Sequence, residues 1–247
     1  MKFSQNNSSD KVFSPFTSHF SRKRCAYTLA EVLITLGIIG VVAALTMPLL
    51  IANHKKKVVE TRLQKTYSII NQAINMAEVD YGSRDYWYNT DDVDNDINGN
   101  IVNGSSPREK WVNKYLVPYM KVIKVDTDEL GRPTIYLADG GIVHCSHESS
   151  LMDWVVYIEE PKKCHNRHIS FGNCAFRFNY APPLHYNDNA FKYIGKNFEP
   201  YKYMWDGTLD KLYSGGYLGC NETSQGYCTA LIQYYGWKIP KNYPIKF

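Results

Sequence analysis

The chain is organised around the stretch Ala26-Tyr27-Thr28-Leu29-Ala30-Glu31-Val32-Leu33-Ile34, which opens a long apolar run. From Val32 to Ala52 there are 21 residues without a charge. As a helix that rises about 1.5 Å per residue, this run would span roughly the 30 Å of bilayer hydrocarbon. Glu31 lies at the edge of the run, where an unpaired carboxylate is unfavourable. The sequence therefore predicts a membrane-spanning helix whose first carboxylate needs a partner.

The residues around the start of this run carry a family resemblance. The apolar run follows a basic leader, the small residue Ala26, the aromatic Tyr27, the pair Thr28-Leu29, and Glu31 in the fifth place from the aromatic residue. This order resembles the N-terminus of type IV pilin or type II secretion pseudopilin precursors. In that family a prepilin peptidase cuts just before the aromatic residue, on the cytoplasmic side, and the new amino terminus is methylated. The resemblance implies cleavage between Ala26, where glycine is commoner, and Tyr27, where phenylalanine is commoner.

The same resemblance implies the organisation and partners of the chain. It covers roughly residues 22–82 and includes Pro48, the twenty-second residue after the expected cut. The expected segments are a removed leader over 1–26, a transmembrane assembly helix over 27–53, the amphipathic half of that helix over 54–82 and a head domain over 83–247. The leader would lie in the cytoplasm and the head outside the cytoplasmic membrane. Expected partners are prepilin peptidase, other pilin or pseudopilin subunits, the inner-membrane assembly platform and membrane lipid.

Thr28, Leu29, Glu31 and Pro48 are the residues that the resemblance assigns to assembly. In a filament, neighbouring apolar helices would bury Glu31, and an isolated buried carboxylate is strongly unfavourable. Its expected partner is the cationic amino group of Tyr27 in a neighbouring subunit, exposed by cleavage. The alternative is that Glu31 only marks the start of the helix, where a carboxylate interacts favourably with the helix dipole.

The charge balance argues against a nucleic-acid partner. The whole chain has 28 Lys and Arg residues and 24 Asp and Glu residues. The leader Met1–Ala26 contains five of the basic and one of the acidic residues, so 23 of each remain in the expected mature chain. A formally neutral composition therefore gives no argument for a nucleic-acid footprint.

The helix is expected to continue past the membrane as an amphipathic segment. Apolar or small residues recur at steps of three and four down to Gly82, which is the pattern of a helix face packed on a core. They are Val59, Leu63, Thr66, Ile70, Ala73, Ile74 and Ala77. In the apolar half, Gly37 and Gly40 lower helix propensity, and Pro48 should kink or locally melt the helix.

The rest of the chain predicts a short helix and several strands. Residues 107–116 have helical spacing. Residues 134–137 and 142–144 flank Asp139-Gly140-Gly141, which is a hairpin signal. Further β-prone runs cover 154–158 and 175–180, whereas the tail from Cys228 reads as a helical turn or a strand. The predicted fold class is α+β: a long N-terminal membrane-spanning helix packed on an antiparallel sheet.

One segment after Gly82 has part of a calcium-loop pattern. Asp94, Asp96, Asn98 and Gly99 follow the D-x-D-x-N-G spacing of such loops. Ser105 stands at the twelfth position, where a bidentate Glu belongs. The chain is expected to need no cofactor, with calcium at this loop as a candidate and a solvated, turn-rich loop as the alternative.

Five cysteines remain after the leader: Cys145, Cys164, Cys174, Cys220 and Cys228. In an exported domain they predict disulfides, and the shortest closures join Cys220 with Cys228 and Cys164 with Cys174. Cys145 with Cys164 is a rival pairing. A zinc site is a further alternative, because cysteines and histidines lie close together in 144–147 and 164–168. Neither segment matches a standard zinc module.

The sequence favours a structural subunit rather than an enzyme. It shows no phosphate-binding loop, no serine elbow and no recognisable Cys–His catalytic arrangement. The function expected from the resemblance is assembly into a type IV pilus or a type II secretion pseudopilus. The rival interpretation is a single-pass, signal-anchored surface protein with a ligand-binding or enzymatic ectodomain.

Overall fold

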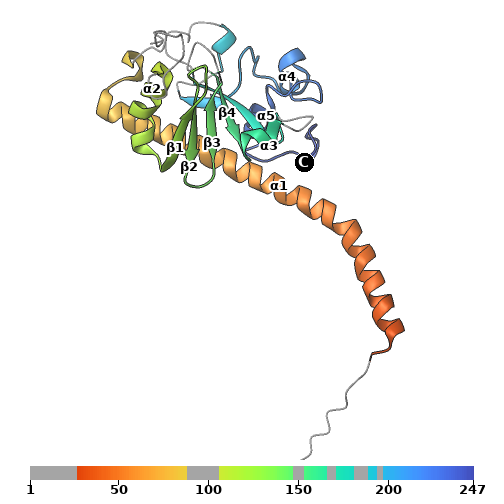
Figure 1. Cartoon of the computed structure of the whole chain (residues 1–247). Coiled ribbons are helices and arrows are strands. Elements are labelled where there is room, and N and C mark those ends of the chain that lie inside the picture. Colours follow the sequence, from red (N-terminus) through yellow and green to blue (C-terminus); the bar gives the residue numbers. More distant parts are fainter. Residues whose placement is uncertain (1–26, 88–105, 147–152, 166–170, 181–188, 194–196) are drawn as a thin grey trace, which may run out of the picture. The chain divides into compact units, whose positions relative to one another are not determined.

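The computed structural model describes residues 27–87, 106–146, 153–165, 171–180, 189–193 and 197–247. The chain divides into two compact units, Met1–Met47 and Pro48–Phe247. The long helix α1 (Leu29–Tyr81) runs from the first into the second, which adds a six-stranded antiparallel sheet and short helices (Figure 1). The predicted α+β class, with a long N-terminal apolar helix and an antiparallel sheet, is confirmed.

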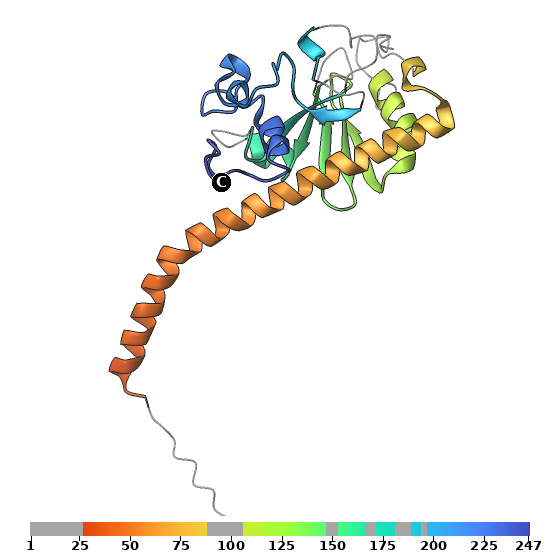
Figure 2. The ribbon, with the colours of Figure 1, turned by 180° about the vertical axis from the view of Figure 1, so that it is seen from behind.

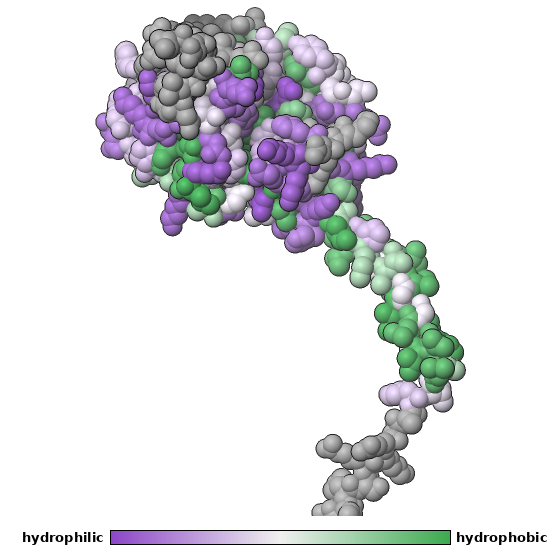
Figure 3. All heavy atoms as spheres, in the orientation of Figure 1, coloured by the Kyte–Doolittle hydropathy of each residue, from purple (hydrophilic) through white to green (hydrophobic). Residues whose placement is uncertain are grey.

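In the first unit, α1 is apolar and its side chains are exposed. The exposed fractions are 78% for Leu29, 60% for Leu36 and 76% for Leu45, and apolar residues dominate the surface of this segment in Figure 3. The helix is long and apolar enough to cross a membrane. It also continues through Pro48 without a break. Local melting at Pro48, one of the two outcomes expected from the sequence, is therefore wrong.

The second unit is built from short elements. Its strands are β1 (Val122–Thr127), β2 (Pro133–Leu137), β3 (Ile142–Cys145), β4 (Asp153–Tyr157), β5 (Ala175–Tyr180) and β6 (Phe198–Pro200). Its helices after α1 are α2 (Pro107–Tyr115), α3 (Pro161–His165), α4 (Leu209–Ser214) and α5 (Cys228–Tyr234). Single 3-10 turns cover Arg84–Tyr86, Val117–Tyr119, Asn189–Phe191 and Gly216–Leu218.

The strands pair in chain order from β1 to β6, and every pair is antiparallel. Ile135 of β2 lies opposite Val143 of β3. In the turn between them, Gly140 has φ 84°, a conformation that favours glycine, and the Gly141 N–H donates to Asp139 Oδ1 at 3.1 Å. The hairpin expected from this Asp-Gly-Gly turn is confirmed, and β4 and β5 match the two further β-prone runs.

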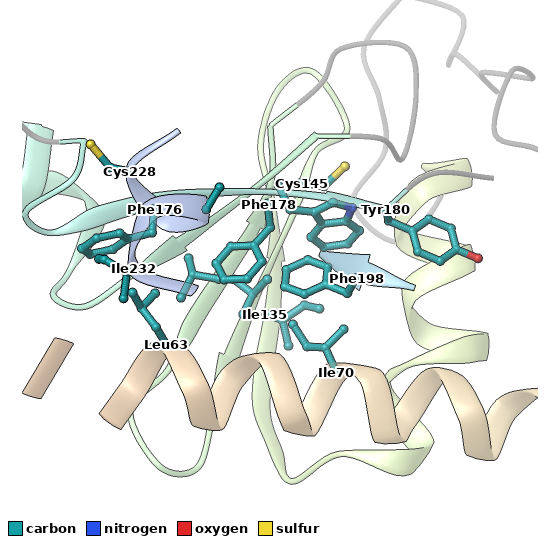
Figure 4. Packing of buried hydrophobic residues seen from close by; sticks show 14 of the residues in the cluster. Leu63, Ile70, Ile135, Cys145, Phe176, Phe178, Tyr180, Phe198, Cys228 and Ile232 are labelled. Carbon is teal, nitrogen blue, oxygen red and sulfur yellow. The ribbon is translucent and has the colours of Figure 1, made fainter. Parts of the chain in front are cut away.

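The second half of α1 packs across one face of this sheet. Its buried residues are those of the predicted stripe: Val59, Leu63, Thr66, Ile70, Ala73, Ile74 and Ala77. Figure 4 shows Leu63 and Ile70 directed toward buried residues of the strands, among them Phe198, and Figure 2 shows the helix crossing the strands. Burying one Leu or Ile side chain is worth about 2 kcal/mol, so the stripe fastens the helix to the sheet.

Polar contacts also tie α1 to the last strand. Asn71 Nδ2 donates to the Phe198 carbonyl at 2.9 Å, and Asn71 Oδ1 accepts the Phe198 N–H at 3.1 Å. One helix side chain therefore pairs with the outer edge of β6 as a neighbouring strand would. Beside it, the Tyr67 hydroxyl donates to Glu199 Oε1 at 3.0 Å.

The opposite face of the sheet carries a smaller apolar cluster. Its buried members include Ile142 of β3 together with Val155 and Tyr157 of β4. Cys164 of α3 and Cys174, just before β5, belong to the same cluster and are joined in a disulfide. This disulfide holds α3 over that face.

Candidate functional site

The start of α1 is closed by reciprocal hydrogen bonds between Thr28 and Glu31. The Thr28 N–H and the Thr28 hydroxyl both donate to Glu31 Oε2, at 2.8 and 2.9 Å. In return, Thr28 Oγ1 accepts the Glu31 N–H at 3.2 Å. This is a capping box, in which the residue before the helix and the third helical residue satisfy each other's backbone donors. The Glu31 carboxylate therefore has a partner within its own chain.

The other residues of the predicted processing and assembly site are exposed where the structure describes them. Tyr27 is 81% exposed and precedes the helix, and Leu29 begins it. Ala26 lies outside the described residues. The site thus consists of an accessible aromatic residue, a hydrogen-bonded carboxylate at the helix start and an apolar helix. Such a helix can insert into lipid or pack against other apolar helices.

The cysteines pair as the shortest closures predict. Cys164 is joined to Cys174, and Cys220 to Cys228. The fifth, Cys145, is fully buried in the main core between α1 and the sheet. The rival pairing of Cys145 with Cys164 is wrong, because these residues belong to clusters on opposite faces of the sheet.

The zinc alternative loses two of its cysteine ligands, because Cys164 and Cys174 are joined in a disulfide. The histidines nearby have other contacts: His144 Nδ1 lies 2.9 Å from the Thr134 hydroxyl, and His165 Nε2 lies 3.2 Å from the Tyr157 hydroxyl. Burial lowers the pKa of His144 to about 4, so this imidazole is neutral at pH 7. His147 and His168 lie outside the described residues.

The candidate calcium residues Asp94, Asp96 and Asn98 also lie outside the described residues, and calcium binding stays a prediction. Elsewhere, within the ranges that the structure describes, no group of three or more His, Cys, Asp or Glu side chains could hold a metal ion.

At least two hollows lie among the described residues of the second unit. One, of about 510 Å³, is lined by Ile69 and Met76 of α1, by the segment before β1 and by the β2–β3 turn. The other, of about 230 Å³, is lined by Asp153, Phe171, Arg177 and Tyr201.

The smaller hollow is the more polar one. The Arg177 guanidinium lies 4.5 Å from the centre of the Phe171 ring, and Asp153 Oδ1 accepts a hydrogen bond from Asn179 at 2.6 Å. Burial raises the pKa of Tyr201, which keeps its hydroxyl protonated. This hollow could hold a small polar ligand.

Residues 49–247 match the model of DUF6613, a family of unknown function. No curated protein and no solved structure matches the chain. The matched range begins after the Tyr27–Glu31 segment and includes the amphipathic half of α1 together with the whole sheet.

Proposed function

The chain belongs to the DUF6613 family, and we propose that it is a pilin-like or pseudopilin subunit. Prepilin peptidase would remove residues 1–26, and the mature chain would assemble through α1 into a type IV pilus or a type II secretion pseudopilus. The inner-membrane assembly platform and other subunits of this class would be its partners. In this role the protein is a structural component rather than an enzyme.

The observation that carries the proposal is the exposed apolar half of α1 with a capped carboxylate at its start. No residue of α1 between Val32 and Ala52 is buried within the structure. A soluble domain rarely leaves so large an apolar surface uncovered. Lipid would cover it before assembly, and neighbouring helices would cover it in a filament.

Glu31 would change partners during assembly. In the separate subunit its carboxylate is held by Thr28. In a filament, a neighbouring subunit displaced along the axis would bring its Tyr27 amino group to Glu31. Lateral packing of the apolar helices would exclude water from this contact. An ion pair is strong only where water is excluded, so the contact favours the correct axial register.

During assembly α1 would be displaced along the filament axis, and its second half would transmit this displacement to the head. Its buried stripe and the contacts of Asn71 and Tyr67 fasten it to the sheet. Displacing the helix along its axis therefore carries the head with it.

Two measurements test the proposal. Intact-mass analysis of membrane-extracted protein should show loss of 26 residues and gain of one methyl group. The Glu31→Leu variant should be inserted, cut and folded, yet absent from sheared surface fractions. The control Glu222→Leu changes an exposed carboxylate of the head and should assemble normally. Recovery of only the full-length chain, or normal assembly of Glu31→Leu, would refute the proposal.

A second candidate function is ligand binding by a head anchored through an uncleaved α1. The 230 Å³ hollow lined by Asp153, Arg177 and Tyr201 favours it. The same mass measurement separates the two functions, because a signal-anchored protein keeps Met1.

A further inference from the structure

Lysines from two segments far apart in the sequence meet at the beginning of the second unit. Three follow the apolar run of α1 after Asn53 and His54, and three lie in the C-terminal segment after α5. Figures 1 and 2 both show the C-terminal end beside this part of α1. We call them the basic surface: Lys55, Lys56, Lys57, Lys238, Lys241 and Lys246. All are exposed except Lys56, which is partly exposed.

Glu60 holds the two segments together. Its Oε1 accepts the Ile239 N–H at 3.0 Å, and its Oε2 lies 3.2 Å from Lys238 Nζ and 3.8 Å from Lys57 Nζ. Lys56 Nζ lies 6.0 Å from the centre of the Phe247 ring. Glu60 carries one negative charge and pairs with two of the six lysines, Lys57 and Lys238.

The position of Lys55–Lys57 is unexpected on the side of the membrane where the head would lie. Basic residues close to a membrane helix favour the cytoplasmic side. Lys55–Lys57 therefore work against the leader residues 22–24, which carry the same charge at the other end of the helix. Because Lys55–Lys57 disfavour insertion in this orientation, we expect them to have a separate role on the exported side.

Aromatic residues flank the basic surface. Tyr234 and Tyr235 are 52% and 38% exposed. Trp237 is partly exposed, with its ring centre 5.0 Å from that of Tyr67. Trp237 has φ 63°, which a residue with a side chain rarely adopts and which is often found at functional sites. Tyr and Trp are enriched where proteins meet the membrane–water interface.

We propose that the basic surface binds anionic phospholipid head groups of the bilayer that α1 enters. Lys55–Lys57 follow the end of the apolar run after Asn53 and His54, and the charge of the basic surface complements the lipid phosphates. The contact holds the head at the membrane until the subunit is drawn into a filament. The inference rests on the proposed function only in requiring that α1 is inserted.

Amine labelling of the full-length protein tests this contact. The protein is reconstituted in phosphatidylcholine vesicles with or without phosphatidylglycerol, and acetylation of each lysine is followed by peptide mass spectrometry. Each lysine at an anionic surface strengthens the contact about fivefold. We expect the basic surface to be protected about tenfold or more only with phosphatidylglycerol, and about 0.5 M salt to remove the protection. Lys121, Lys124 and Lys192, exposed elsewhere on the head, should label equally in both lipids.

A matched pair of triple variants separates a local effect from a general one. Replacing Lys238, Lys241 and Lys246 by Gln should reduce the protection of Lys55–Lys57 to the level in phosphatidylcholine, because three lysines at about fivefold each account for an effect of about tenfold. Replacing Lys121, Lys124 and Lys192 by Gln should leave it unchanged. Equal labelling in both lipids overturns the proposal. Protection that depends on protein density instead of lipid charge also overturns it and would indicate a protein partner.

Insertion is measured in the same vesicles by resistance to alkaline carbonate extraction. Extraction of the protein would overturn both this inference and the assembly proposal. Resistance to extraction without lipid-dependent protection would overturn the lipid contact alone.

Discussion

Asn71 provides the sharpest test of how α1 is joined to the head. Its side-chain amide makes both hydrogen bonds to the backbone of Phe198, the first residue of β6. Phe198 is 1% exposed, so water cannot readily replace these bonds. Asn71→Ala removes both partners and leaves a buried N–H and a buried C=O at the edge of the sheet.

The expected loss follows from these two groups. Leaving a buried donor or acceptor unsatisfied costs about 1 to 3 kcal/mol, and partial relaxation of a three-residue strand reduces the total. We expect the free energy of unfolding of the head to fall by about 2 to 4 kcal/mol. For a domain of about 200 residues, this corresponds to a decrease in Tm of about 4 to 16 °C.

Thermal unfolding of the full-length protein in detergent, followed by near-ultraviolet circular dichroism, measures this loss. The control Gln72→Ala changes the next residue of the same helix, which is exposed, and should shift Tm by no more than about 2 °C. An Asn71→Ala variant as stable as the control would refute the idea that this side chain closes the edge of β6.

Three further changes test the head. Between pH 6.5 and 4 the unfolded chain protonates His144 while the folded chain, with its pKa lowered to about 4, does not. Stability should therefore fall as the pH decreases, by up to about 3 kcal/mol, and His144→Gln should flatten this part of a urea-unfolding profile. Replacing Cys220 and Cys228 together by Ala should cost about 2 to 3 kcal/mol by the same assay. Leu63→Ala, at a fully buried position, should cost about 2 to 5 kcal/mol, measured against Gln64→Ala, which changes an exposed neighbour.

The sequence predicted those elements whose signals are local. The seven residues of the α1 stripe repeat at steps of three and four, and all seven are buried. The β2–β3 hairpin has its turn chemistry within three residues, 139–141. In both cases the spacing of side chains along the chain already determines which face is buried.

The two edge strands were not predicted, because their pairing depends on distant residues. β1 exposes Ile123 and Lys124 and has an irregular register between Val122 and Lys124, so its alternation is weak. β6 has three residues and ends in Pro200, and its outer edge is paired by Asn71, which lies 127 residues away. Such contacts exist only after the helix has packed on the sheet.

At the candidate site, the sequence predicted that Glu31 needs a partner but not which partner lies nearest. The spacing Thr28-x-x-Glu31 is the signature of a capping box, and it could have been recognised. The basic surface also required the structure, because Lys238, Lys241 and Lys246 reach α1 through the contact of Ile239 with Glu60.

The capping box changes how Glu31 would act in the proposed assembly. Because the carboxylate already accepts hydrogen bonds from Thr28, the separate subunit does not carry a bare charge at the membrane edge. If Glu31 exchanges Thr28 for a neighbouring amine, the free energy gained is only the difference between two states in which the carboxylate has a partner. That difference is large only where water is excluded. A helix packed out of register would weaken the box without reaching an amine. In the proposed assembly, the box would let Glu31 tolerate the membrane edge before assembly and would make its later ion pair depend on register.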